Sequence, residues 1–436
     1  MSAATFSRKS WAILGALTLL GVSVPPARAA EVTRVVTALD ENDTFDFNLT
    51  AAWFHDSRSA AINREYESSG GLSLVRDLKY ARTSDMLDLR TDFGILWDVG
   101  LHIDLPIVIA DSNNLTFDQG VNAGNSTFVR DGIYPAYNGT SSTVFQSPTR
   151  SGLQYLGVGI QWAVFNQKRD DTKPTWTLGF DADLDVFKDM RFDPANPNGN
   201  TAVGLGYHQL IWSTWVSKRF RYFDPYFGAS YMLPIRTNGS IYQDLGGGQT
   251  AVNPQQQAMV VIGVEQVAWE NPSGDQRVTI EVQAHAEEHF AGRGMSELWE
   301  PLSGSSACGN ANAAACRVGI DLQYPSATNA GQLVNAPYPG VSDIDAYGSF
   351  GGEAGLNIQV GRYIRFRGLF GMTFDAPHFI TDASAGVDAD GDGKVDSTKS
   401  AEANPTYREA LDIPGRRFRV ESSRDWHLFL QGSLMF

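Results

Sequence analysis

The chain of 436 residues is acidic, with 34 Lys and Arg against 49 Asp and Glu and a formal net charge of −15. This balance argues against nucleic-acid binding, which needs a basic face. Its mean hydropathy is slightly negative, which does not exclude a membrane barrel, because only one face of each barrel strand is apolar.

Residues 1–29 have the pattern of a secretory signal peptide. Arg8 and Lys9 precede an apolar run from Trp11 to Val24, and small residues lead to a predicted cut after Ala29. The alternative is a membrane anchor, but a helix of about 14 residues is shorter than the ~30 Å of a bilayer core. We therefore expect an exported protein that begins near Ala30.

The remainder of the chain shows period-two alternation of apolar and polar residues, which is typical of strands with one buried face. Leu101, Ile103, Leu105, Ile107 and Ile109 alternate with His102, Asp104 and smaller residues in one such segment. We predict strands at 44–55, 84–97, 101–110, 152–166, 175–188, 204–219, 222–235, 257–269, 277–290, 347–361, 363–375 and 424–436.

The last predicted strand places Trp426, Leu428, Leu430, Leu434 and Phe436 on one side, and the sequence stops on that final aromatic residue. Such a terminal strand resembles the closing strand of bacterial outer-membrane β-barrels. In that family the strand is what the barrel assembly machinery recognises. The resemblance implies a protein of the outer membrane, in contact with its lipid and lipopolysaccharide, built as a porin-like barrel.

Short and long connections alternate between the predicted strands. Five tight turns and six long loops match an antiparallel transmembrane β-barrel with short periplasmic turns and long extracellular loops. We predict one all-β barrel over residues 30–436, with about twelve strands, although ten or fourteen would also fit, and long loops near 111–151, 291–346 and 377–422. A secreted β-sandwich is the alternative, but it would not need an apolar outer face on every strand.

The polar faces of the strands are predicted to line the lumen. The candidates for lumen and selectivity are Asp88, Arg90, Asp92, Asp181, Asp183, Asp185, Glu281, Glu353, Arg365 and Arg367. One interpretation is a water-filled pore whose carboxylates favour cations. The other is a filled lumen in which Arg365 and Arg367 pair with Glu353 and other acids.

His285, Glu287 and His289 suggest a metal site, but their strand spacing argues against it. Alternate residues of a strand lie about 7 Å apart, so the two histidines would be about 13 Å apart. We do not expect one ion to reach all three.

The most specific short motif is Asp388-Ala389-Asp390-Gly391-Asp392-Gly393-Lys394-Val395-Asp396. Carboxylates at positions 1, 3, 5 and 9 and Gly at position 6 resemble an EF-hand calcium loop, in which Lys394 would offer its carbonyl. Lys399 stands where that loop has its bidentate Glu, so Glu402 or Asp382 would have to complete the shell. A solvated acidic loop is the alternative to a structural Ca²⁺ site.

The only cysteines, Cys308 and Cys316, are predicted to form a disulfide in an exported protein, with two free thiols as the alternative. The sequence thus favours a non-enzymatic outer-membrane channel for small hydrophilic solutes, with a preference for cations. The alternatives are a surface-binding or adhesion barrel with calcium-braced loops, and a lipid-modifying enzyme. Oligomeric state and substrate are left open.

Overall fold

A computed structural model describes residues 30–36, 46–95, 98–134, 137, 139, 141–193, 195–305, 322–325, 333–336, 338–399 and 401–436. The predicted signal peptide lies outside these ranges, as do Cys308 and Cys316 of the predicted disulfide. Within the described ranges, no helix has the length and apolar character needed to cross a membrane.

Twelve long strands form one antiparallel ring, which confirms the predicted fold class and strand number. In chain order they are β1 (Phe47–Ser68), β2 (Gly71–Gly94), β3 (Val99–Phe117), β6 (Leu156–Phe165), β7 (Thr175–Leu184), β8 (Tyr207–Ser217), β9 (Phe223–Arg236), β10 (Gln257–Glu270), β11 (Arg277–His289), β16 (Tyr347–Val360), β17 (Ile364–Asp375) and β19 (Phe418–Met435).

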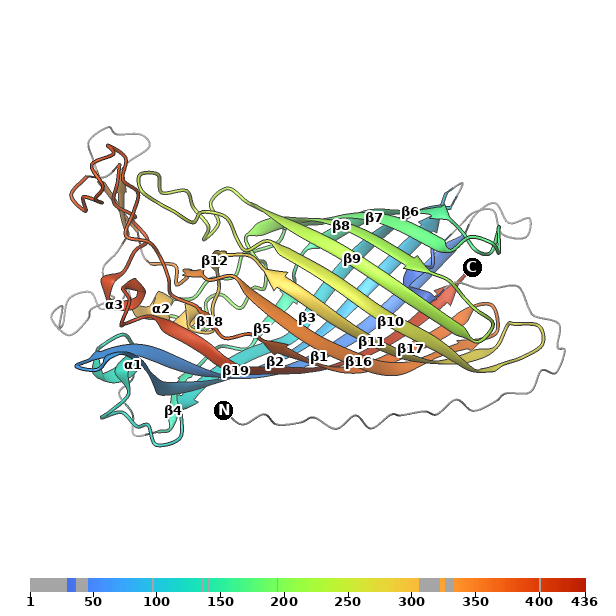
Figure 1. Cartoon of the computed structure of the whole chain (residues 1–436), viewed down its shortest axis with the longest axis horizontal. Helices are drawn as coiled ribbons and strands as arrows, with labels where there is room; N and C mark the ends of the chain where they lie inside the picture. The colour runs from blue at the N-terminus through green and yellow to red at the C-terminus, as the bar shows by residue number, and fades with distance from the viewer. Residues whose placement is uncertain are drawn as a thin grey trace, which may run out of the picture.

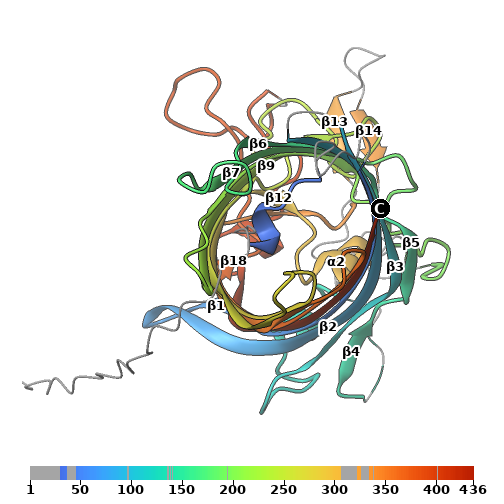
Figure 2. The ribbon, with the colours of Figure 1, turned by 90° about the vertical axis from the view of Figure 1, so that its right-hand side faces the viewer.

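The ring closes where the first strand meets the last. β1 pairs with β19 from Asn48↔Met435 to Arg64↔Phe418, and β1 also pairs along its whole length with β2. Figure 1 shows the strands tilted to the long axis, and Figure 2 shows the closed ring end-on. Closure gives every long strand two hydrogen-bonded neighbours.

Apolar side chains cover the outside of the ring. On β3, Leu101 and Ile103 are 41% and 46% exposed, whereas His102 between them is only 5% exposed. The long strands therefore turn apolar side chains outward and most of their charged side chains into the lumen, the reverse of a soluble protein. This arrangement is what a lipid surrounding requires.

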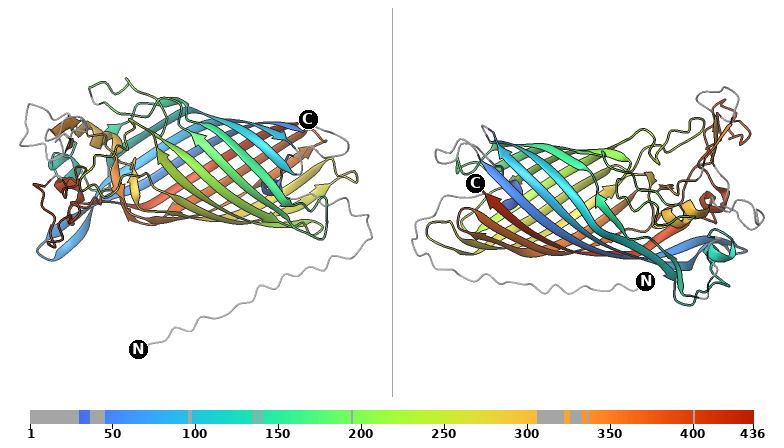
Figure 3. Two further views of the ribbon diagram at one scale, coloured as in Figure 1. Left: turned by 90° about the horizontal axis from the view of Figure 1, so that it is seen from above. Right: turned by 180° about the vertical axis from the view of Figure 1, so that it is seen from behind.

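Residues 56–83 lie between the first two predicted strands, 44–55 and 84–97, but in the structure they extend β1 and β2 beyond the rest of the barrel. The two strands join at Ser69-Gly70 in a two-residue hairpin loop, followed by Gly71 with φ of 106°. The prediction failed there because the outer face of β1 becomes polar at Ser57 and Ser59. The alternation of apolar and polar residues therefore ends, while the hydrogen-bonded pairing of β1 with β2 continues. Figure 3 shows this hairpin projecting from one end.

Short elements gather at the end of the barrel that carries the long connections, here called the long-loop end (Figure 1). They are α1 (Thr127–Arg130), β4 (Thr143–Gln146), β5 (Arg150–Leu153), β12 (Gly292–Gly294), α2 (Trp299–Ser305), β13 (Leu322–Pro325), β14 (Leu333–Ala336), β15 (Ser342–Ile344), β18 (His378–Phe379) and α3 (Glu409–Asp412). The opposite end, with the tight turns, is the short-turn end.

The long connections pack together into a cap with its own hydrophobic core. Phe128, Leu302, Ile380, Leu411 and Phe418 are fully buried in this core, which also includes Ile62 and Leu78 of the projecting hairpin. The loops are therefore a folded layer anchored on β1, β2 and β19.

The segment after the predicted cleavage site enters the ring. The short 3-10 helix η1 (Glu31–Thr33) lies inside the barrel near the short-turn end, seen as the dark-blue turn in Figure 2. Ala30 is fully buried there against Tyr226 and Val261. Residues 30–42 precede the first predicted strand, and nothing in their local pattern points to a contact with distant strands.

The cap should be more stable at mildly acidic pH because of Asp412 in α3. Burial raises the pKa of Asp412 to about 7, although the backbone N–H groups of Arg408 and Ala383 donate to its carboxylate. The pKa of this carboxyl in the unfolded chain is the ordinary 3.8, so stability falls as pH rises from about 4 to about 7. We expect protease cleavage of the cap to be slower at pH 5 than at pH 8. The reason is that the free energy of opening the cap is higher at pH 5 by on the order of 1 kcal/mol.

The Asp412→Asn variant should lose most of this difference, whereas Glu409→Gln on the exposed side of α3 should keep it. Intact-mass analysis of limited digests at the two pH values measures both. An unchanged pH dependence in Asp412→Asn would contradict the assignment.

Candidate functional site: the luminal cavity

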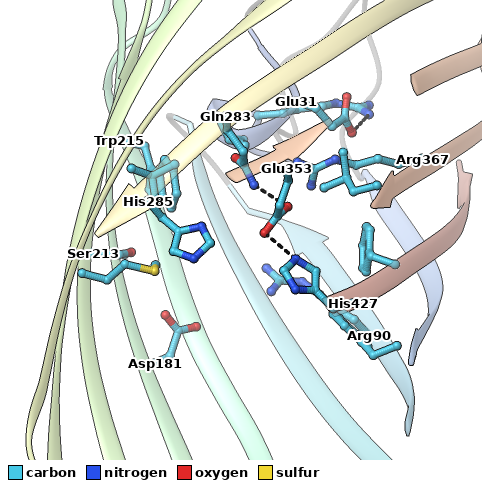
Figure 4. A pocket seen from close by; sticks show the side chains of 18 of the residues that line it. Glu31, Arg90, Asp181, Ser213, Trp215, Gln283, His285, Glu353, Arg367 and His427 are labelled. Carbon is cyan, nitrogen blue, oxygen red and sulfur yellow. Dashed lines mark hydrogen bonds and ion pairs between the residues drawn. The ribbon is translucent and has the colours of Figure 1, made fainter. Parts of the chain in front are cut away.

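A cavity of about 640 Å³ occupies the lumen next to η1, whose residues Glu31 and Val32 form part of its lining. Charged and polar side chains from opposite walls reach into it, as Figure 4 shows for Asp181, His285, Glu353 and His427. Its other ionisable lining residues are Glu31, Arg34, Asp56, Arg90, His102, Glu287 and Arg367.

Glycines on the inner wall decide how these side chains lie. Gly159 on β6 faces His102 on β3 and Asp181 on β7 in the strand register, and the two side chains meet across it with His102 Nε2 2.5 Å from Asp181 Oδ1. A Cβ at Gly159 would collide with both side chains. The missing side chain thus makes room for a contact between strands that are not neighbours.

The same arrangement recurs on the opposite wall. Gly371 on β17 separates Glu353 on β16 from His427 on β19, whose Nε2 lies 3.0 Å from Glu353 Oε1. Gly351 likewise separates His285 from Thr373, with 3.1 Å between His285 Nε2 and the hydroxyl oxygen. These side chains lie flat along the wall and leave the centre of the lumen open.

At the short-turn end, η1 crosses the lumen and is held by polar contacts. The Glu31 carboxylate pairs with Arg365 at 2.6 Å, and the Glu31 backbone N–H donates to Glu265 at 2.7 Å. Thr33 and Ser217 share a hydroxyl–hydroxyl hydrogen bond of 2.7 Å. The segment therefore closes part of the lumen through a small number of hydrogen bonds and one ion pair.

A second cavity of about 370 Å³ lies toward the long-loop end. Asp56 lines the first cavity and Arg58 the second, and Glu287 and His289 are divided in the same way on β11. Alternate residues on a strand are about 7 Å apart, so the two cavities follow one another along the barrel.

The segment before and within α2 narrows this second cavity. Arg58 Nη2 lies 2.7 Å from Glu297 and 2.8 Å from Asp375 of β17. Buried Arg150 pairs with buried Glu300 at 2.6 Å, and its guanidinium lies over the Trp299 ring. Two ion pairs thus fasten one loop across the mouth of the barrel.

The lumen residues named from the sequence fall into three groups. Asp181, Arg90, Glu353 and Arg367 line the first cavity. Glu281 is fully buried and pairs with Arg367 at 2.7 Å, and Arg365 pairs with Glu31. Both arginines therefore pair with acids, as in the filled-lumen alternative, but these acids are Glu281 and Glu31 and not Glu353.

The remaining acids sit beside the cavity. Asp92 pairs with Arg90 at 2.8 Å, and Asp88 and Asp183 lie on the same wall near Asp104. Asp185 lies just beyond the end of β7, where its carboxylate accepts a hydrogen bond from Thr237. Of the three candidate aspartates Asp181, Asp183 and Asp185, Asp181 is the one that lines the first cavity.

His285, Glu287 and His289 do not converge. His285 contacts Thr373, whereas His289 stacks on Tyr347 with ring centroids 4.3 Å apart, and His378 stacks on the other side of that tyrosine at 3.7 Å. In the described part of the chain, the sets of side chains close enough to share a metal ion are His102/Asp104/Asp181 and Asp388/Asp390/Asp392.

The Asp388–Asp396 motif forms an exposed turn in the cap. The backbone N–H groups of Gly393 and Gly391 donate to Asp388 and lower its pKa. The Lys399 ammonium lies 2.6 Å from Asp390 and 3.1 Å from Glu402, and Asp396 accepts from Thr398. Asp388, Asp390 and Asp392 are close enough to share an ion, with Lys394 and Asp396 following in the turn, and Lys399 supplies the local positive charge.

A closed twelve-strand barrel with an apolar exterior and a polar lumen defines an outer-membrane β-barrel protein. No protein-family model and no curated protein matches the chain.

Solved outer-membrane barrels resemble the chain weakly. An outer-membrane channel from Pseudomonas putida F1 has a TM-score of 0.36 and 6% identity, over 89% of this chain and 95% of that one. The outer-membrane protease OmpT from Escherichia coli has a TM-score of 0.29 and 6% identity, over 91% and 99%. A FadL homologue from Pseudomonas aeruginosa has a TM-score of 0.28 and 8% identity, over 90% of each chain. Similarity at this level carries no argument about function.

If the Asp388–Asp396 turn binds calcium, Ca²⁺ at millimolar concentration should protect the segment around Lys394 and Lys399 from trypsin. The physical reason is that oxygens held around one ion restrict the turn that the protease must open. Digests with Ca²⁺, Mg²⁺ or a chelator, followed by peptide mapping, measure the effect. Asp390→Asn should abolish it, and equal cleavage in all three buffers would leave the solvated acidic turn as the correct interpretation.

Proposed function

We propose that this protein is an outer-membrane channel for small hydrophilic solutes, with a preference for cations, and that it has no enzymatic activity. The observation that carries the proposal is the 640 Å³ luminal cavity, into which charged side chains reach beside apolar ones such as Trp215, Met259 and Val261. A barrel with a purely structural lumen would gain by filling this volume with packed side chains, because unfilled space forfeits dispersion contacts.

The charges around the cavity support the preference for cations. On one wall, Asp88, Asp104, Asp181 and Asp183 stand near the single guanidinium of Arg90, which also pairs with Asp92. On the opposite wall, Glu353 is paired with His427, while Glu287 lies within 3.5 Å of His289. Carboxylates in excess inside a low-dielectric tube attract cations and repel anions.

The second cavity contains four arginines, each with a carboxylate partner. Arg82 binds Asp111 through two hydrogen bonds, and Arg293 pairs with Asp343 at 3.1 Å, in addition to the pairs of Arg58 and Arg150. Because these guanidinium charges are compensated, we assign selectivity to the first cavity.

We further propose that η1 and the α2 segment hold the channel closed in this conformation. The two closures differ in strength. The α2 segment places Leu298 and Leu302 in the core of the cap, whereas η1 rests on a few polar contacts and the packing of Ala30. Release of η1 therefore breaks mainly polar contacts, whereas release of the α2 segment exposes buried apolar side chains.

Refolded protein in planar bilayers should give a cation-selective current under a KCl gradient. The double variant Asp181→Asn/Asp183→Asn removes two luminal charges and should lower the K⁺/Cl⁻ permeability ratio by about twofold or more. Asp170→Asn alters an exposed turn outside the lumen and serves as the matched control. Absence of current from folded, heat-modifiable barrels of both the parent protein and the Glu31→Ala/Thr33→Ala variant, in which η1 is weakened, would overturn the channel proposal and favour the surface-binding alternative.

Weakening η1 should increase the current. The variant Glu31→Ala/Thr33→Ala removes the ion pair to Arg365 and the hydrogen bond to Ser217. The population of the open state should therefore rise by roughly tenfold, which corresponds to 1.4 kcal/mol in its free energy. Single-channel open probability is the readout, with Asp275→Asn on a turn of the same end as control. An unchanged open probability would show that η1 does not gate the lumen.

A further inference from the structure

We propose that the wall formed by β3, β6 and β7 binds a divalent transition-metal ion through His102, Asp104 and Asp181. The site goes beyond a general preference for cations, because it combines an imidazole with carboxylates at fixed positions. It also rests on different observations, so it stands whether or not the barrel conducts.

The backbone register brings the ligands together. His102 and Asp104 are alternate inward residues of β3, and Asp181 and Asp183 are alternate inward residues of β7. Between them runs β6, which presents only Gly157 and Gly159 at these two levels, so side chains from β3 and β7 meet over a strand that has none. Two glycines two residues apart thus make a shallow floor under four ligand-type side chains.

The distances suit one small ion. One ligand atom from each of His102, Asp104 and Asp181 lies within 4.8 Å of the others. His102 Nε2 is 2.5 Å from Asp181 and 3.5 Å from Asp104 Oδ2. Ligands around a tetrahedral Zn²⁺ at about 2.1 Å lie about 3.4 Å apart, so rotamer adjustments of about an ångström complete the geometry.

Two carboxylate oxygens at this wall accept no hydrogen bond from the described part of the protein. Asp104 Oδ1 is buried and accepts no hydrogen bond in the described structure; its nearest cation is Arg90 at 3.6 Å. Asp88 Oδ1 on the neighbouring strand β2 is also buried without a hydrogen bond. Buried carboxylate oxygens are costly without a partner, so these atoms favour a cation at this wall.

An ion would reach the site from the first cavity. His102 and Asp181 both line that cavity, and the Asp181 side chain is 27% exposed, whereas that of His102 is 4% exposed. A fourth position toward the cavity is then open to water, as in sites that exchange their metal. Asp183 lies beside Gly157, across that glycine from Asp104, and adds negative charge to the site.

The ligand set selects the class of metal. Ca²⁺ and Mg²⁺ prefer six or more oxygen ligands, whereas imidazole together with carboxylates suits Zn²⁺ and its first-row neighbours. This distinguishes the wall from the all-oxygen Asp388–Asp396 turn of the cap.

Isothermal titration of Zn²⁺ into the full refolded barrel, in detergent without chelating buffer, tests the proposal. We expect binding that a ~100-fold excess of Mg²⁺ does not displace. His102→Gln, Asp104→Asn and Asp181→Asn should each weaken this binding by about tenfold or more. His55→Gln removes the histidine of an outward-facing His–Asp pair, with Asp85 at 2.9 Å, and should leave binding unchanged.

X-ray absorption at the zinc edge gives a second readout. The parent protein should show one imidazole among nitrogen and oxygen neighbours at about 2.0–2.1 Å, and folded His102→Gln should lose the imidazole signal. Heat-modifiable gel mobility verifies that each variant is folded. Binding that survives in all three folded variants, or no binding by the parent, would overturn the site. Neither result depends on a current, so failure of the channel proposal is measured separately.

Discussion

The structure depends on one constraint: a backbone that crosses lipid must satisfy its hydrogen bonds within the protein. A strand has no internal hydrogen bonds, so a sheet in lipid must close on itself, and here β1 pairs with β19 to do so. Closure turns the polar face of every strand inward, where charged side chains share a confined space. These charged side chains must therefore find compensating partners within the lumen.

Many charged side chains of the lumen pair with a partner that lies two strands away, across one intervening strand. Inward glycines at positions 159, 351 and 371 let side chains two strands apart make contact, as His102 and Asp181 do. Such contacts hold side chains against the wall and preserve a cavity along the axis. Where carboxylates outnumber basic groups, on the wall of β2, β3 and β7, unsatisfied oxygens remain, and these carry both the cation preference and the metal site that we propose.

The two ends of the barrel are closed by different means. At the long-loop end, apolar residues from several loops form a folded cap over the projecting β1–β2 hairpin. At the short-turn end, a few hydrogen bonds and one ion pair hold η1 inside the ring. The cap is thus held by a buried apolar core, whereas η1 is held mainly by polar contacts.

The sequence by itself determined the barrel, a strand number of about twelve, and the inward position of residues such as Asp181 and Glu353, because period-two alternation reports directly which face meets lipid. It did not reveal that residues 56–83 continue β1 and β2, since alternation of the lipid type ends where the strands leave the membrane. Only the tertiary structure decided which luminal residues meet, that Arg365 pairs with Glu31 rather than Glu353, that η1 enters the lumen and that the α2 segment lies across its mouth. These contacts join residues far apart in the chain, and they depend on register and barrel curvature, which local patterns do not encode.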